Sequence, residues 1–354
     1  MITFKKIDLF TATREEWNNY HKIRREFHLE EFPNEPITSD KATEIMKCGY
    51  AKGFHLVVGN FLIYDNNKLV GLLSYDYYGK DAPSYKGNEK IVHFDISLLR
   101  NYRRKGIGTK SLQLLIDQCE PVNKSIFITE TTLSDVKGFF KHIGAPIAQT
   151  AFRSKLLFSD VDMDMITTWI KEAEVNNPDS KAMIIDGVKP EKYIKEIVKS
   201  FNLSGNDEPK GDLETGDDVM SEKSVRNEEQ VNISAGVKDL MGIVIEKDNK
   251  ISALTHVKIY PGKEKLLSQS FTGVPEEYRG RKLGKWIKAK MIQYITSQYP
   301  ESEAIVTGNA DSNAPMLHIN IALGYKKYKE EFIAQITLEN IKGYLNSKIT
   351  TITT

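Results

Sequence analysis

The sequence has little of several features that would point to particular classes of protein. Its only cysteines, Cys48 and Cys119, lie far apart and match no metal-binding or redox spacing. With 49 basic and 48 acidic residues, the net charge is +1, so nothing attracts the chain generally to nucleic acid or membranes. No apolar run has the length of a membrane span, and the N-terminal residues lack the apolar segment of a secretory signal. We therefore expect a cytoplasmic protein with no metal, no nucleic acid partner and no membrane partner, whose oligomeric state the sequence leaves open.

What the sequence does contain is an internal repeat. The segment from Tyr102 to Gly108 (YRRKGIG) returns as Tyr278 to Gly284 (YRGRKLG), about half the chain length further on. Each copy stands between a strand-like apolar run and an amphipathic, helix-like run. The length of 354 residues is also that of about two ordinary domains. The sequence therefore predicts two similar halves.

The repeated segment has the composition of a phosphate-binding turn. Glycines let a bulky anion approach the backbone, and the first N–H groups of a helix have no partner within that helix. Flanking arginines and lysines add positive charge. A glycine-rich turn of this kind suits a pyrophosphate, and two turns in register are a stronger signal than one.

These residues resemble the R/Q-x-x-G-x-G/A signature of the GNAT superfamily of acyl-CoA-dependent N-acyltransferases. Arg103 to Gly108 matches it in full, whereas Lys282 replaces the middle glycine of the second copy. The resemblance covers most of residues 240–335 and, less densely, 55–155. On these residues the chain is identified as a tandem GNAT protein, which implies acetyl-CoA (coenzyme A) as the cofactor.

The order of predicted elements gives an α/β fold, with a mixed sheet (α+β) and helices on both faces, built as two tandem GNAT-like acyl-CoA N-acyltransferase domains. Each half is predicted to contain a hairpin, a strand, a phosphate turn followed by a helix, and a final strand-helix-strand unit. We place the N-terminal domain at residues 1–160, as a degenerate copy, and the C-terminal, catalytic domain at 161–354. Residues 205–230, which are polar and acidic, are predicted to be a loop.

The resemblance also implies which residues hold the cofactor. In GNAT folds these are the end of the strand before the turn, the turn itself, and polar residues after the next strand. In the second half they are Thr272, Gly273, Val274, Arg279, Gly280, Arg281, Lys282, Leu283, Gly284, Lys285, Asn309 and Asn313. In the first half they are Leu98, Arg103, Arg104, Lys105, Gly106, Ile107, Gly108 and Thr109. For Asn313 the alternative is that it lies in the first turn of the last helix while Ser312 caps that helix, so that the segment serves only for capping.

The catalytic residues are less clearly marked. Many GNAT enzymes carry a tyrosine in the last helix that protonates the departing thiolate; here Phe140 and Asn320 occupy that place. Asn320 can still donate a hydrogen bond, so we predict a catalytic role for it. His256, in the hairpin of the second half, is the predicted base, and His93, in the central strand of the first half, is the candidate base there. The alternatives are that both histidines are structural, or that water relays the proton to a carboxylate.

The acceptor is predicted from the acidic run between Asp207 and Glu229, which carries nine carboxylates against three basic residues. Placed where GNAT folds select their acceptor, this run would attract a small cationic amine such as a polyamine or amino sugar. Three alternatives stay open: a merely solvated loop, catalysis in the first half, and a sensor or scaffold that binds acyl-CoA without turnover.

Overall fold

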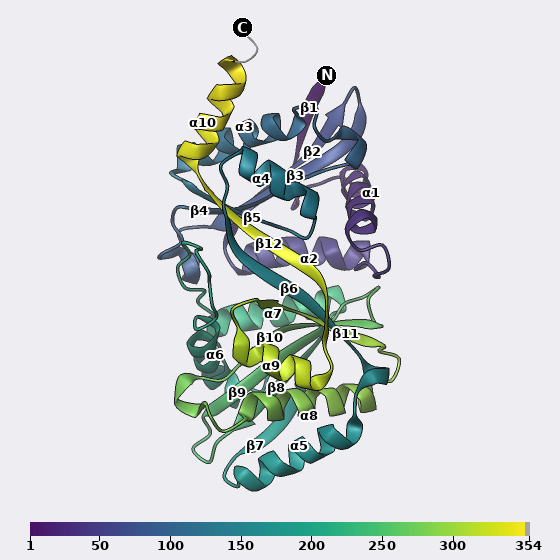
Figure 1. Cartoon of the computed structure of the whole chain (residues 1–354), viewed down its shortest axis with the longest axis vertical. Helices are drawn as coiled ribbons and strands as arrows, with labels where there is room; N and C mark the ends of the chain where they lie inside the picture. The colour runs from purple at the N-terminus through teal and green to yellow at the C-terminus, as the bar shows by residue number, and fades with distance from the viewer. Residues whose placement is uncertain (351–354) are drawn as a thin grey trace.

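A computed structural model describes residues 1–350 of the chain, which build one mixed sheet with helices on both faces (Figure 1). The sheet has 12 strands in the order β1-β2-β3-β4-β5-β12-β6-β11-β10-β9-β8-β7. The predicted fold class is therefore confirmed. Within these residues, no helix is both long enough and apolar enough to cross a membrane.

The two halves of the chain run through the same series of elements. The first series is β1 (Ile2–Ile7), α1 (Arg14–Glu31), α2 (Asp40–Gly53), β2 (Leu56–Asp65), β3 (Lys68–Tyr78), β4 (Ile91–Leu98), α3 (Ile107–Cys119), β5 (Ile126–Thr131), α4 (Lys137–His142), β6 (Ile147–Leu157) and α5 (Met163–Asn176). The second is β7 (Lys181–Asp186), α6 (Glu191–Gly205), α7 (Glu222–Ala235), β8 (Lys238–Ile245), β9 (Ile251–Ile259), β10 (Leu266–Gly273), α8 (Leu283–Gln298), β11 (Ala304–Ala310), α9 (Ala314–Leu323), β12 (Lys326–Thr337) and α10 (Leu338–Thr350).

One prediction from the sequence was wrong in part. The acidic stretch 205–230 was predicted to be a loop, but its last third forms the start of α7. The Ser221 side chain accepts a hydrogen bond from the Ser224 backbone N–H, and Gly236 ends the helix in a left-handed conformation. Only residues 206–221 connect α6 to α7 without a helix or strand.

The halves exchange their last strand and helix. Strand β6 pairs with β11 of the second half, and β12 returns to pair with β5 of the first half; β6 and β12 pair with each other at the centre. The helices follow their strands, so α5 packs on α8 and α10 packs on α3. The junction predicted near residue 160 lies between β6 and α5, both of which pack against the second half.

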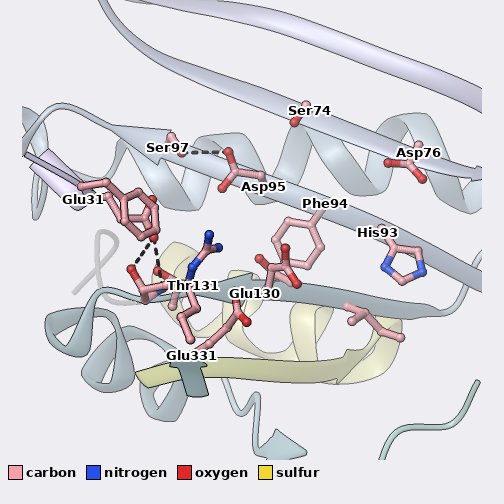
Figure 2. Close-up of a pocket in the computed structure, with 15 residues that line it drawn as sticks. Glu31, Ser74, Asp76, His93, Phe94, Asp95, Ser97, Glu130, Thr131 and Glu331 are labelled. Carbon is pink, nitrogen blue, oxygen red and sulfur yellow. Dashed lines mark hydrogen bonds between the residues drawn. The ribbon is translucent and has the colours of Figure 1, made fainter. Parts of the chain in front are cut away.

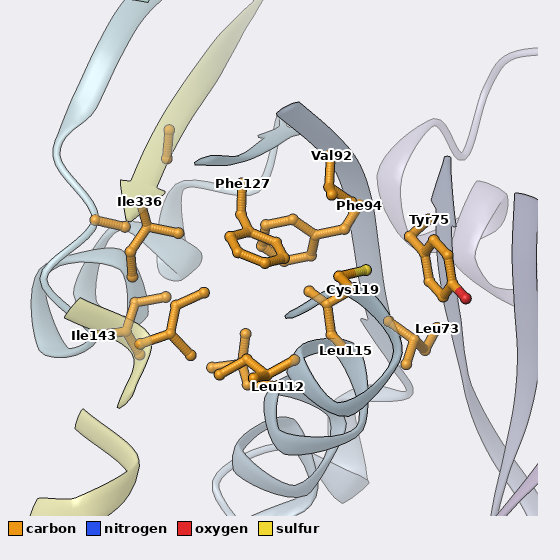
Figure 3. Close-up of a cluster of buried hydrophobic side chains, with 14 of the residues drawn as sticks. Leu73, Tyr75, Val92, Phe94, Leu112, Leu115, Cys119, Phe127, Ile143 and Ile336 are labelled. Carbon is orange, nitrogen blue, oxygen red and sulfur yellow. The ribbon is translucent and has the colours of Figure 1, made fainter. Parts of the chain in front are cut away.

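The exchange also completes the hydrophobic core of the first half (Figure 3). Phe127 and Leu112 are fully buried in this core, on β5 and α3. Phe332 and Ile341, from the C-terminal end of the chain, pack into the same cluster. The first half therefore lacks a closed core until β12 and α10 have joined it.

This arrangement predicts that Phe332→Ala destabilises the first half, although residue 332 belongs to the second half by sequence. Removing a fully buried phenylalanine costs ~3–5 kcal/mol of unfolding free energy. Chemical denaturation, with hydrogen exchange followed at the amides of α3, should show the loss there. Ile321→Ala, at a residue that is 67% exposed on α9, is the control and should change stability by less than ~0.5 kcal/mol. Unchanged protection of α3 in Phe332→Ala would contradict this account of the core.

Candidate active site

The two phosphate turns have the same backbone although their sequences differ. In the first turn, Arg104 and Gly106 have φ of 62° and 74°; in the second, Gly280 and Lys282 have φ of 82° and 61°. The left-handed positions thus coincide, and each turn fills one with glycine and the other with a basic residue. Lys282 therefore adopts the conformation that the family glycine would take, and the second turn forms without a glycine at this position.

One arginine braces each turn in the same way. Arg103 donates from Nε to the carbonyl of Leu98 at 2.9 Å, and Arg279 donates from Nε to the carbonyl of Val274 at 3.2 Å. Arg103 also forms an ion pair with Glu30 at 2.7 Å, as Arg279 does with Asp207 at the same distance. These two arginines hold the strand end and the turn together.

The turns differ in the side chains that they leave at the surface. In the first turn Arg104 and Lys105 are exposed, and a side chain at Gly106 would point into open space. The N–H groups at the start of α3, from Ile107 to Thr109, follow directly. This turn fits a pyrophosphate, because its surface combines positive charge, helix N–H groups and room.

In the second turn more of the predicted cofactor ligands are used inside the protein. Arg281 donates to Asn177 and Ser180 and forms an ion pair with Glu246 at 3.1 Å. The ammonium of Lys285 lies over the ring of Trp169, 3.6 Å from its centroid.

The remaining predicted ligands are placed as follows. Ile107 and Leu283 are buried, and so are Gly273 and Gly284. Thr109 shares a hydrogen bond with Tyr344 of α10 at 2.8 Å, and Thr272 shares one with Thr255 at 2.7 Å. Gly108 lies against the ring of Phe139, at 3.7 Å from where a side chain would begin.

The parallel strands next to each turn separate before they reach it. The parallel pairing of β4 with β5 ends at His93 and Ile128, and that of β10 with β11 ends at Gln269 and Thr307. Beyond these pairs the strand ends no longer bond to each other. In the first half a pocket of about 550 Å³ opens along the gap (Figure 2).

Four carboxylates line this pocket from four neighbouring strands. They are Asp76 on β3, Asp95 on β4, Glu130 on β5 and Glu331 on β12, which we call the carboxylate row. Figure 2 shows them facing the pocket from its two sides, with His93 at one end. Glu331 belongs to the second half by sequence, so the exchanged strand completes the site. Arg153 of β6 and Glu31 of α1 complete the charged lining.

The pocket is short of positive charge. Burial raises the pKa of each of the four carboxyl groups in the row. The Asp95 and Glu130 side chains are both exposed to the pocket, so the protein around the pocket removes only part of the water near them. Ser97 donates to Asp95 at 2.7 Å and offsets part of this effect. A cation in the pocket would stabilise the charged forms of these groups.

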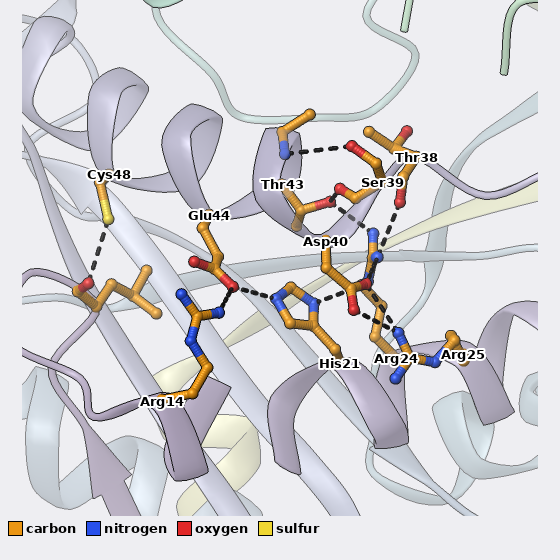
Figure 4. Close-up of polar contacts among 12 residues, drawn as sticks. Arg14, His21, Arg24, Arg25, Thr38, Ser39, Asp40, Thr43, Glu44 and Cys48 are labelled. Atoms are coloured by element: carbon orange, nitrogen blue, oxygen red, sulfur yellow. Dashed lines mark hydrogen bonds and ion pairs between the residues drawn. The ribbon is translucent and has the colours of Figure 1, made fainter. Parts of the chain in front are cut away.

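The wall that carries Glu31 is fixed in place by a polar cluster between α1 and α2 (Figure 4). His21 contacts Glu44 at 2.9 Å, and Arg24 donates to Thr43 at 2.7 Å. Burial lowers the pKa of His21, which favours the neutral ring. The two helices therefore form one rigid cover over the sheet beside the pocket.

In the second half, different side chains occupy the positions that line the pocket of the first half. Since Arg103 and Arg279 mark equivalent strand ends, Phe271 takes the place of Asp95. Its partner on β9 is His256, as Ser74 of β3 is the partner of Asp95. Two residues further along, Lys258 takes the place of Asp76. An apolar ring and two basic residues thus replace three polar groups of the pocket.

His256 itself, the predicted base, is only 7% exposed and belongs to a buried ion-pair cluster. It contacts Asp239 at 2.6 Å, and Lys189 contacts the same carboxylate at 2.7 Å. Burial alone would raise the pKa of Asp239, but the charges and hydrogen bonds of His256 and Lys189 outweigh it and lower that pKa. Lys258 is paired with Glu228 in the same way.

Of the predicted polar residues, the structure brings two together. Asn320 is buried and donates from Nδ2 to Asn309 Oδ1 at 2.7 Å. Its own Oδ1 is buried and has no hydrogen-bond partner among the described residues. Asn313 is itself the N-cap of α9 and accepts from the N–H of Met316, whereas the capping alternative gave the cap to Ser312. Asn320 lies on the α8 side of the sheet, whereas His256 faces α7.

Sequence reasoning missed the carboxylate row, although a signal for it exists. His93, Asp95 and Ser97 alternate with apolar residues in β4, as Ser74 and Asp76 do in β3. In a central strand this alternation puts polar groups on one face of the sheet. No group of three or more metal-binding side chains gathers anywhere in residues 1–350 in a way that could hold a metal ion.

The shared turn geometry predicts opposite effects for two matched substitutions. A left-handed backbone costs a non-glycine residue ~1–2 kcal/mol of folding free energy. Glycine avoids this strain, but it loses more conformational entropy on folding, which offsets part of the gain. Lys282→Gly should therefore stabilise the protein by roughly 0.5–1 kcal/mol, and Gly106→Lys should destabilise it by a similar amount. Urea denaturation of both variants tests this. A loss of stability in Lys282→Gly would mean that its side chain makes contacts worth more than the backbone strain.

The raised pKa of Glu130 predicts a pH-dependent effect on stability. The folded protein holds this proton to a higher pH than the unfolded chain, so the group destabilises the fold once the pH exceeds about 4.3. The cost is complete above the raised pKa. Glu130→Gln should therefore be more thermally stable than the wild type at pH 8, and the difference should shrink towards zero near pH 4. Glu174→Gln, at an exposed residue of α5, is the control and should show no such trend. A constant difference at both pH values would contradict the assignment.

Comparison with known proteins agrees with this geometry. The model of the acetyltransferase (GNAT) family matches residues 17–144. No match to the chain was found among curated proteins.

The similar solved structures include a tandem GNAT protein from the clavulanic acid biosynthesis pathway, without AcCoA, at 14% identity and a TM-score of 0.71, covering 95% of this chain and 98% of that one. Another is a GCN5-related glucosamine N-acetyltransferase region of a fungal multi-domain GH3 β-N-acetylglucosaminidase, at 10% identity and a TM-score of 0.64, covering 95% of this chain and 38% of that one. A third is a GCN5-related N-acetyltransferase from Sphaerobacter thermophilus, at 9% identity and a TM-score of 0.61, covering 95% of both chains.

At these identities the structures establish the fold and not the substrate. Residues 17–144 therefore belong to the GNAT acetyltransferase family, and the chain as a whole has the fold of a tandem GNAT protein.

Proposed function

We propose that the protein is an acyl-CoA-dependent N-acyltransferase that transfers an acetyl group from acetyl-CoA to a small cationic amine in the first half. The observation that carries the proposal is the carboxylate row. It lies in the gap between β4 and β5, next to the turn with the complete phosphate signature. A site with this charge attracts an ammonium group and repels anionic acceptors.

The first half has the parts needed to hold the cofactor. The turn from Arg103 to Gly108 would bind the pyrophosphate through the N–H groups at the start of α3 and the charges of Arg104 and Lys105. The end of β4, from Ile96 to Leu98, no longer pairs with β5 and can bond to the pantetheine arm. Bound acetyl-CoA would supply the reactive thioester carbonyl.

The carboxylate row can also take up the proton that the amine must lose. An ammonium group cannot attack a carbonyl, so a base must deprotonate it first. A carboxylate with a raised pKa accepts a proton more readily than an ordinary one. Asp95 is the member of the row that lies on β4, the strand whose end would hold the thioester. We therefore assign the role of base to Asp95. Phe140 cannot act as an acid. The thiol of coenzyme A, with a pKa of ~8.5 as for an ordinary thiol, can nevertheless leave as the thiolate.

A second candidate keeps the activity in the second half, as the sequence predicted. The buried, unpartnered Oδ1 of Asn320 beside Asn309 favours it, because such an atom is costly unless something binds there. Against it, Phe271 and Lys258 stand in the places of Asp95 and Asp76, and His256 in the place of Ser74. His256 and Lys258 are each already paired with a carboxylate, Asp239 and Glu228.

One assay separates the two halves by matched substitutions. Gly106→Glu and Lys282→Glu place the same charge at the same position of the two turns. With acetyl-CoA and 1,4-diaminobutane, Gly106→Glu should lower the release of free thiol at least tenfold, while Lys282→Glu should leave it within about twofold. The reverse result would move the chemistry to the second half and overturn our assignment.

The same assay tests the class of acceptor. Asp95→Asn should lower kcat, and Glu331→Gln should raise the KM for the diamine and leave the KM for acetyl-CoA unchanged. The KM for the diamine should also rise with salt, because opposite charges are screened within about 8 Å at physiological ionic strength. Preference for neutral or acidic amines would exclude a cationic acceptor. Binding of coenzyme A without turnover of any amine would support the sensor or scaffold alternative.

A further inference from the structure

A second pocket, of about 310 Å³, lies beside the carboxylate row and shares Asp76 and His93 with the first pocket. Most of its lining is aromatic or aliphatic, so we call it the hydrophobic annex. The first half contributes Phe54, Leu56, Tyr77, Tyr78 and Ile91, and the second half contributes Phe201, Val219 and Met220. The annex therefore exists only where the two halves meet.

The wall from the second half is held in place by hydrogen bonds to its backbone. Asn202 donates to the carbonyl of Met220 at 2.9 Å and accepts from its N–H at 2.8 Å. Ser84 of the first half accepts from the N–H of Val219, also at 2.8 Å. In addition, Tyr78 donates to the side-chain carboxylate of Asp218 at 2.8 Å. Side chains facing the annex can thus be changed while the backbone stays fixed.

The two pockets are ordered along β4. The phosphate turn follows the end of this strand, Ser97 and Asp95 come next, and His93 marks the boundary with the annex. From Ser97 to His93 the strand covers roughly 13 Å. An amine that reaches the carboxylate row from the side opposite the cofactor therefore leaves the rest of its structure in the annex.

We propose that the acceptor is a primary amine that also carries an aromatic or branched aliphatic group, which occupies the hydrophobic annex while the ammonium lies at the carboxylate row. This inference rests on the proposed function. A linear polyamine would put a second charged group in the annex, whose lining is mainly apolar. Of its two carboxylates, Asp76 is shared with the carboxylate row and Asp218 is hydrogen-bonded to Tyr78. The annex thus favours an acceptor with an apolar far end, and 1,4-diaminobutane should be acetylated but less efficiently than such an amine.

The test compares amines of equal charge, 2-phenylethylamine and ethylamine, with 1,4-diaminobutane as the linear diamine. We expect kcat/KM to be at least tenfold higher for 2-phenylethylamine than for ethylamine, because a pocket for an apolar group discriminates by that factor or more. Met220→Gln, which is similar in length but polar, should reduce this ratio at least threefold. Met220→Leu should keep the ratio. Val188→Gln, at an exposed apolar residue outside the annex, is the control.

The outcomes separate this inference from the proposed function. If all three amines are acetylated equally well and Met220→Gln changes no ratio, the annex proposal fails and the proposed function stands. If no amine is acetylated, calorimetry decides: tighter binding of 2-phenylethylamine than of ethylamine, lost in Met220→Gln, supports the annex as a binding site. Equal or absent binding of the two amines overturns it.

Discussion

The structure depends on one constraint, the central pairing of β12 with β5 and β6. Strand β12 comes from the far end of the chain. It contributes side chains to both the pocket and the hydrophobic core of the first half. Because side chains alternate along a strand, Glu331 faces the pocket while Phe332 enters the hydrophobic core. A shift of one residue in the register would reverse the two faces, so the same hydrogen bonds fix the core and the charge of the site.

The two halves keep a common backbone but use it differently. Both turns have left-handed residues at the same positions, and both are braced by an arginine. The first half leaves its carboxylates open to a pocket. The second half fills the equivalent space with His256, Lys258 and their carboxylate partners, whose removal from water is repaid only while each charge keeps its partner. This difference supports a division in which one half binds the acceptor and the other holds the assembly together.

The second half still contributes to the site of the first. Besides Glu331, it provides the fixed segment from Asp218 to Met220. Helices α2 and α7 pack against each other between the halves, where Tyr50 donates to Asn232 at 2.6 Å. Since two strands and two helices are exchanged as well, the halves cannot separate without opening both cores. A tandem chain guarantees this arrangement at any protein concentration, because both partners are on one polypeptide.

The sequence by itself determined the repeat, the order of most elements and both phosphate turns, because glycine positions and hydrophobic periodicity act locally. It also indicated that Lys282 stands at a glycine position, although only the backbone revealed that the lysine adopts the same conformation. Tertiary structure alone decided which strands pair. It brought Asp76, Asp95, Glu130 and Glu331 onto one face from positions far apart in the chain. It also placed His256 in a buried ion pair, because the partners of a polar side chain are set by long-range packing, which local patterns do not encode.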